Sequence, residues 1–167
     1  MRWKKMLGCL VMSLVLLGST LPSSSMAASA ASDVVMKAVY HVDFNSAKRM
    51  NATLRNIYNL VNYYTTHNID YDVRLVSNSA GVQFLIKNVK GTKFAKNKVS
   101  AKTAKSIREM MQSLADGYNV KFEQCSITLQ RTHINKSRLK SFVTTTPSGQ
   151  VRLVQLESEG YAYIKVQ

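Results

Sequence analysis

The chain has 167 residues, and its 23 lysine and arginine residues against 9 acidic residues give a formal net charge of +14. This length fits one domain and is enough to bury a hydrophobic core without disulfide or metal staples. Two cysteines, with no CxxC, no HExxH and no His/Cys cluster at ligand spacing, exclude the disulfide-stapled scaffolds and argue against a zinc or dithiol site. We therefore expect no metal and no cofactor.

The first 30 residues have the three-part layout of a secretory signal peptide. Three basic residues within residues 2–5 precede an apolar run over residues 6–17, and small residues follow at 28–30. The run is shorter than the about 20 residues that a membrane-spanning helix needs. We expect residues 1–30 to be cleaved off.

The mature chain would carry 20 basic and 9 acidic residues, a net charge of +11, and a single cysteine, Cys125. The other cysteine, Cys9, lies near the start of the apolar run, whereas a lipidated cysteine follows such a run. The sequence thus predicts a periplasmic or secreted protein without a transmembrane segment, built as a single domain over residues 31–167.

The first part of this domain has a strand followed by a long helix. Residues 34–42 are apolar on both sides, which is typical of a buried strand. Asn45 or Ser46 can cap a helix, and apolar residues then recur at helical spacing up to about Thr66. Residues 71–77 alternate in polarity and predict a second strand.

The middle of the domain is predicted to hold two further helices around a polar loop. Ser79 is expected to cap a short helix. Residues 87–100 are polar and rich in lysine, as in an exposed loop. A helix is predicted over residues 101–115, with Gly117 as its stop signal.

In the last part of the domain, predicted strands again alternate with predicted helices. Residues 120–125 predict a strand, residues 126–131 a helix, and residues 161–166 a final strand. Between them, Pro147-Ser148 is a helix start signal and Gly160 a stop signal. Strands alternating with helices predict a three-layer α/β domain, Rossmann-like or flavodoxin-like, with a mostly parallel sheet of about five strands.

Cys125 is the leading candidate for chemistry. It ends a predicted strand, and Ser126 begins a predicted helix, so the cysteine would lie where α/β sheets place their sites. Helix N-terminal amides lower the pKa of a thiol, and the resulting thiolate is a nucleophile and an acceptor of sulfane sulfur. The alternative is a buried cysteine that acts as a small apolar side chain. The residues alone leave both open.

Four stretches of the sequence resemble the DsrE/DsrF-like family. They are KAVYHV in the first strand, LRNIYNL in the first helix, VKFEQCSITL around Cys125, and SGQVRLVQLESEGYAYIKV at the end. The resemblance implies a Rossmann-like domain that assembles into trimers or hexamers. In sulfur-relay members, a cysteine at this strand-to-helix junction carries a persulfide and passes it to a partner protein, and Cys125 stands at the matching position. Ser126 and Asn56 are expected to line that site.

Two histidines are weaker candidates. His41 ends the first predicted strand, near the same sheet edge as Cys125, and a proton donor there would be useful, although a core histidine is the ordinary alternative. His133 follows Cys125 by eight residues and would approach it if the intervening helix is short; a loop histidine is its ordinary interpretation.

Eight basic residues and no acidic ones lie within residues 87–108. The ordinary interpretation is a solvated loop, and the functional one is an anion-binding surface that uses Lys90, Lys93, Lys96 and Lys98. Nucleic acid is not an expected partner, because Phe94 is the only aromatic residue in this segment.

Two functional hypotheses follow. The first is a periplasmic carrier, at most a sulfurtransferase-type enzyme, that binds or relays sulfane sulfur through Cys125 and meets a sulfur-donor or acceptor protein. The second is a non-catalytic, homo-oligomeric binding module for an anionic ligand or a protein partner.

Overall fold

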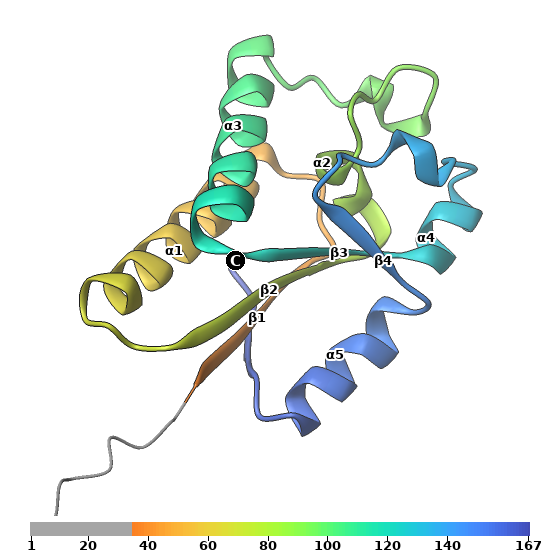
Figure 1. Cartoon of the computed structure of the whole chain (residues 1–167). Helices are drawn as coiled ribbons and strands as arrows, with labels where there is room; N and C mark the ends of the chain where they lie inside the picture. Colours follow the sequence, from red (N-terminus) through yellow and green to blue (C-terminus); the bar gives the residue numbers. More distant parts are fainter. Residues whose placement is uncertain (1–34) are drawn as a thin grey trace, which may run out of the picture. The chain divides into compact units, whose positions relative to one another are not determined.

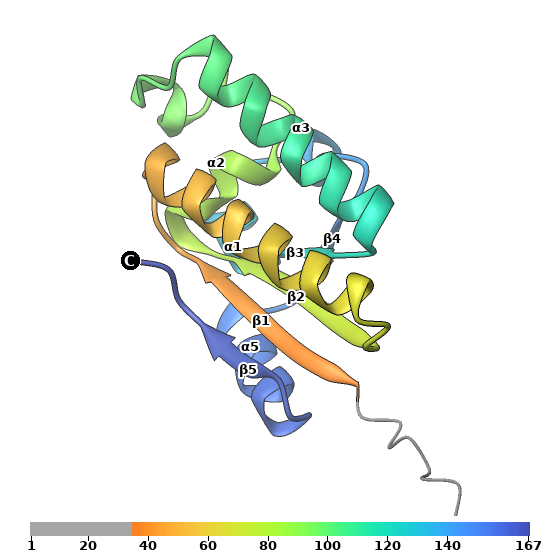
Figure 2. The same cartoon turned by 90° about the vertical axis from the view of Figure 1, so that its left-hand side faces the viewer.

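The computed structural model describes residues 35–167, and the predicted signal peptide over residues 1–30 lies outside them. Five parallel strands form one sheet in the order β4-β3-β2-β1-β5 (Figures 1 and 2). The strands are β1 (Met36–Val42), β2 (Tyr71–Ser77), β3 (Lys121–Cys125), β4 (Val143–Thr146) and β5 (Ala162–Ile164). The predicted α/β fold with a parallel sheet of about five strands is confirmed.

One face of the sheet is covered by α1 (Ala47–Thr66) and α3 (Ala101–Tyr118), which lie side by side (Figures 1 and 2). The Ser46 side chain caps α1, as predicted, and Ser100 caps α3. Every third or fourth residue of each helix is apolar and therefore meets the sheet. The buried residues of this layer are Met50, Leu54, Ile57 and Val61 from α1 and Ile107, Met111 and Leu114 from α3.

The opposite face carries α5 (Gly149–Ser158), which Figure 1 shows below the sheet. Its apolar contact is small and consists of Val39, Val76, Leu153, Leu156 and Tyr161. Because side chains alternate between the faces of a strand, the charged residues of β2 and β3 also point to this side. Polar contacts as well as apolar burial therefore hold α5 on the sheet.

Short elements make the remaining connections. The chain runs through a 3-10 turn (Ser79–Gly81) into α2 (Val82–Leu85), a second turn (Lys93–Lys96) lies in the lysine-rich segment, and α4 (Ser126–Arg131) follows β3 directly. A third 3-10 turn (Lys136–Arg138) leads to β4. Along residues 35–167, no helix combines the length and the apolar character needed to cross a membrane.

Two local predictions need correction, and one strand has no counterpart among the predictions. Ser79 does not cap a helix, because it adopts a left-handed conformation at φ 47° and begins the 3-10 turn. Helix α3 continues through Gly117 to Tyr118 and ends at Asn119, whose φ of 53° supplies the left-handed C-cap. Strand β4 was not predicted, and it is a four-residue edge strand with three threonines.

Candidate functional site

The candidate site lies at the carboxyl edge of the sheet, where β3 ends and α4 begins. Cys125 is the last residue of β3 and the N-cap of α4, with an extended backbone that lets the chain turn into the helix. Its neighbour across the sheet is Thr146, the last residue of β4. The Cys125 side chain is buried, with 5% of its surface exposed.

The first turn of α5 lies against this cysteine. Ser148 caps α5 by accepting a hydrogen bond from the Val151 amide, and Gly149 is the first helical residue. A Cβ atom on Gly149 would lie 3.2 Å from the Cβ of Cys125 and 3.2 Å from the Cβ of Asn78. Glycine therefore lets the start of α5 approach the cysteine closely.

Thr128 supplies a hydroxyl on the other side of the cysteine. Its Oγ1 atom accepts a hydrogen bond of 3.0 Å from the backbone amide of Ser79. Because the amide occupies an acceptor position of Oγ1, the hydroxyl proton remains free to point at the sulfur of Cys125.

The pKa of the Cys125 thiol lies below its ordinary value. Burial raises it, but the amides and the hydroxyl around the sulfur outweigh burial; they belong to Gly149, Thr128 and Ile127. The thiol makes no N-cap hydrogen bond of standard geometry to α4. These dipoles therefore act by favouring the negative charge of the thiolate, as helix N-terminal amides do.

A line of hydrogen bonds runs along the carboxyl edge of the sheet, from the outer strand β5 toward the cysteine. The Tyr163 hydroxyl lies 2.7 Å from Nδ1 of His41, and Nε2 of His41 lies 3.2 Å from Oδ1 of Asn78. Both contacts are satisfied when Tyr163 donates to Nδ1 and Nε2–H donates to Asn78. Burial lowers the pKa of His41, which keeps the imidazole neutral near pH 7.

His41 and Cys125 both belong to this edge, but Asn78 lies between them. Asn78 bonds His41 and lies in contact distance of Gly149, which in turn contacts the cysteine. No hydrogen bond joins His41 directly to Cys125 within residues 35–167. His41 is thus placed to orient Asn78.

The other predicted site residues lie farther out. Ser126 and His133 border a shallow hollow on the surface beside α4, and His133 is exposed with a φ of 53°. Asn56 is exposed on α1, which covers the other face of the sheet. The four lysines of the predicted anion-binding surface are exposed and form no ion pair within the described part of the chain; they are Lys90, Lys93, Lys96 and Lys98.

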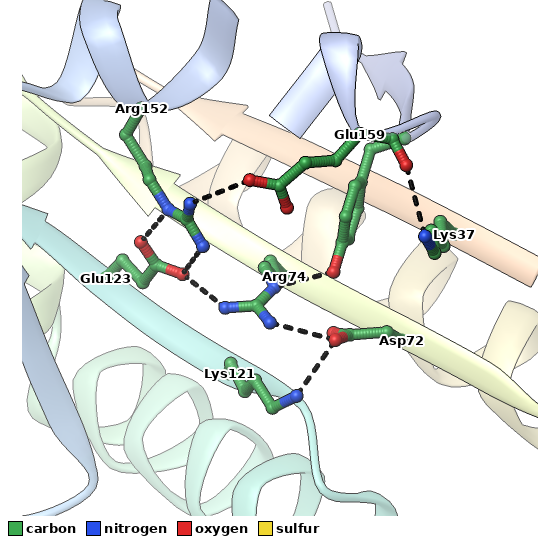
Figure 3. Close-up of polar contacts among 8 residues, drawn as sticks. Lys37, Asp72, Arg74, Lys121, Glu123, Arg152 and Glu159 are labelled. Carbon is green, nitrogen blue, oxygen red and sulfur yellow. Dashed lines mark hydrogen bonds and ion pairs between the residues drawn. The ribbon is translucent and has the colours of Figure 1, made fainter. Parts of the chain in front are cut away.

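A network of charged side chains holds α5 on the sheet (Figure 3). Both carboxylate oxygens of Glu123, two residues before Cys125, accept hydrogen bonds from arginines. Arg152 of α5 donates from Nε at 2.8 Å, and Arg74 of β2 donates from Nη1 at 2.8 Å. The network continues through Asp72, Lys121, Tyr161, Glu159 and Lys37. Because Arg152 lies in the first turn of α5, its bond to Glu123 also positions Gly149.

Replacing Gly149 by alanine should raise the pKa of Cys125. The added methyl group would be closer to two carbon atoms than the about 3.5–4.0 Å of ordinary contact, so the first turn of α5 must move away from the sulfur. Loss of one hydrogen-bond-like contact, about 1 kcal/mol, predicts that the alkylation profile moves to higher pH, with up to about fivefold slower alkylation over the range in which the thiol titrates. Iodoacetamide kinetics followed against pH measure this.

Gly117→Ala is the matched control for that substitution. A methyl group on Gly117 meets no atom within 4 Å, and the residue lies at the end of α3, before the start of β3, whereas Cys125 lies at the end of that strand. Its alkylation profile should equal that of the wild-type protein. An unchanged profile for Gly149→Ala as well would contradict the role given to the α5 amide.

The fold and the site together define a class of protein. It is an all-parallel α/β domain with a cysteine at the carboxyl end of the third strand. Its sequence matches the DsrE/DsrF-like family over residues 33–166, and the chain belongs to that family. No curated protein matches the sequence.

Two solved structures are similar in fold. The protein of unknown function MTH1491 from Methanobacterium thermoautotrophicum has 22% sequence identity and a TM-score of 0.58, and the match covers 78% of this chain and 98% of that one. The ychN protein from E. coli has 15% identity and a TM-score of 0.50, with 78% and 99% covered. At these identities the similarity shows the fold alone.

Proposed function

We propose that this protein is a periplasmic sulfur carrier in which Cys125 accepts and relays sulfane sulfur as a persulfide. The observation that carries the proposal is the set of amides and the hydroxyl that lower the pKa of this thiol at the end of β3. The family to which the chain belongs supports the same chemistry.

The proposed step exchanges one S–S bond for another. The thiolate of Cys125 attacks the outer sulfur of a donor persulfide, the S–S bond of the donor breaks, and the donor cysteine leaves as a thiolate. The transferred sulfur then forms a persulfide on Cys125, and the reverse chemistry passes it to an acceptor thiol. No external oxidant is consumed, because the sulfane sulfur keeps its oxidation state.

The first test is the titration of the Cys125 thiol. Since its pKa is lowered, the rate of alkylation should rise and level off at a lower pH than for an ordinary cysteine, whose pKa is about 8.5. After incubation with a persulfide donor, mass spectrometry should find one added sulfur atom on Cys125. Cys125→Ser should carry none. A thiol that reacts only above about pH 8.5 would sink the proposal.

The burial of Cys125 favours a second candidate, the non-catalytic oligomeric binding module. Only 5% of the cysteine is exposed, which leaves little room for a donor to approach. On this alternative, Cys125→Ser would leave the cellular function intact, while reversing the charges of Lys90, Lys93, Lys96 and Lys98 would abolish it. The sulfur carrier predicts the opposite pattern.

The proposal includes export and self-assembly. The signal-peptide layout of residues 1–30 supports export, and N-terminal sequencing of the periplasmic protein should begin at residue 28 or 31. Family membership supports a trimer or hexamer. Light scattering of the purified protein should give that mass, and a monomer would contradict this part.

A further inference from the structure

A cavity of about 270 Å³ lies under the lysine-rich segment, and Cys125 is not among its lining residues. It opens between α3, the segment that follows α2, and the chain just before β4. Its volume is close to the lower end of the about 300–1,000 Å³ that is usual for small-molecule sites. The cavity is therefore suited to a compact ligand.

The inner wall of this cavity is apolar. Phe84, Ile86, Phe94 and Ile107 line it, and each is buried, with 2–6% of its surface exposed. Backbone hydrogen bonds between the segments of Ile86 and Leu139 fix one side of it. Such a wall favours the hydrocarbon part of a ligand.

The rest of the lining includes three cationic side chains, three amide side chains (Gln83, Asn88 and Asn97) and no acidic one. The cationic side chains are Lys87, Arg108 and Lys140, and all three also border a second hollow beside the first. None of them takes part in any ion pair found over residues 35–167. The cavity thus has a positive rim without a protein counter-charge.

Lys140 is the most constrained of these cations. Its ammonium group donates to the carbonyl oxygens of Phe84 and Ile86, the latter at 2.9 Å, which leaves one proton for another acceptor. Burial, with the nearby charge of Arg108, lowers the pKa of Lys140 to about 8. An anion between the two side chains would relieve this repulsion.

We propose that this cavity binds a small organic anion with an apolar body, such as a medium-chain carboxylate, whose charged group lies between Arg108 and Lys140. The apolar wall takes the hydrocarbon part, and the two cations supply charge-assisted hydrogen bonds. This site is independent of the sulfur chemistry proposed for Cys125. It also differs from the exposed lysine surface predicted from the sequence, since none of Lys90, Lys93, Lys96 and Lys98 lines the cavity.

Calorimetric titration of the full protein with octanoate, sulfate and 1-octanol tests the proposal. Octanoate should bind saturably with one site per chain, at least tenfold more tightly than either of the other two. Sulfate binding as tightly as octanoate would show that the apolar wall contributes nothing and would overturn the proposal. Equal binding of 1-octanol would overturn the role of the cations, and absence of octanoate binding would overturn the whole.

Variants then locate the binding. Arg108→Gln should weaken octanoate binding roughly tenfold, because one charge-assisted contact is lost. Ala104→Phe should block the cavity, since Ala104 lines it from an exposed position on α3 where a larger side chain leaves the core intact. Lys96→Gln, outside the cavity, should bind as the wild type does. Unchanged binding by the Arg108 and Ala104 variants would place octanoate elsewhere and refute the site.

Discussion

Replacing Glu123 by leucine is expected to destabilise the fold by about 3–5 kcal/mol, the loss typical of removing one partner from a buried charge pair. Glu123 has 8% of its side chain exposed, and it neutralises two arginines, Arg74 and Arg152, that have 18% and 19% exposed. Leucine has a similar volume, so the loss would come from the two guanidinium groups, which would keep only Asp72 and the more exposed Glu159 as acidic partners. Urea unfolding measures the change.

An exposed pair gives the control for this experiment. Lys105 and Glu109 lie 3.7 Å apart on α3 with 67% and 61% of their side chains exposed, so Glu109→Gln should cost less than about 1 kcal/mol. Adding Arg74→Met and Arg152→Leu to Glu123→Leu should restore much of the stability, because hydrophobic side chains replace buried ions well. Equal losses for Glu123→Leu and Glu109→Gln would contradict the network's role.

The same substitution, Glu123→Leu, should also change the pKa of the Cys125 thiol. Arg152 ties the first turn of α5 to β3 through Glu123, and Gly149 in that turn lowers the pKa of Cys125. Glu123→Leu should therefore also move the alkylation profile to higher pH, at temperatures where the variant is still folded. A shift in stability without a shift in the profile would show that α5 keeps its place without the ion pair.

Gly81→Ala is expected to cost about 3 kcal/mol or more, at the upper end of the range for overpacked positions. A Cβ atom on Gly81 would lie 2.2 Å from the carbonyl oxygen of Val42 and 2.7 Å from Oγ of Ser77. The nearest of these atoms belongs to the backbone at the end of β1, which cannot rotate away. The turn after β2 would have to move instead, and thermal unfolding would report the loss.

This turn also carries part of the site. The Gly81 amide donates to the carbonyl oxygen of Asn78 at 2.9 Å, and Ser79 bonds Thr128, so the variant should also slow alkylation of Cys125 at pH 7. Gly117→Ala, in an exposed helical position, should instead stabilise the protein by about 0.5–1 kcal/mol. Equal stability of the two alanine variants would contradict the packing described for Gly81.

The fold could be predicted largely because its main elements carry local signals. The stripe of α1, the apolar β1 and the serine caps at Ser46 and Ser148 depend on nearby residues alone. Strand β4 was missed because it has four residues at the edge of the sheet, and only Val143 joins the larger apolar core. The end of α3 was misplaced because two residues with stop character, Gly117 and Asn119, lie close together, and Asn119 is the one that takes the left-handed conformation.

The candidate site could be predicted only in its centre. The junction at Cys125 is visible in the sequence, because its strand and helix are adjacent. Thr128 is three residues after Cys125, in the helix that the cysteine caps, so its spacing along the chain does relate it to the cysteine. Asn78 and Gly149 approach from two other segments, and no spacing along the chain relates them to it. The sequence did hint at one of these contacts. A helix predicted to start at Ser148 would place its first, unpaired backbone amides at the sheet edge where the cysteine also lies.

The pairing of β5 with β1 sets the order in which the site can be completed during synthesis. Tyr163 and His41 are 122 residues apart, yet they share a hydrogen bond, and Lys165 is joined to Asp43 across the same distance. A chain still emerging from the ribosome already contains Cys125 and β3 but lacks the strand that covers His41. The thiol is therefore synthesised before β5, the strand of the five-stranded sheet whose Tyr163 completes the hydrogen bonding of His41.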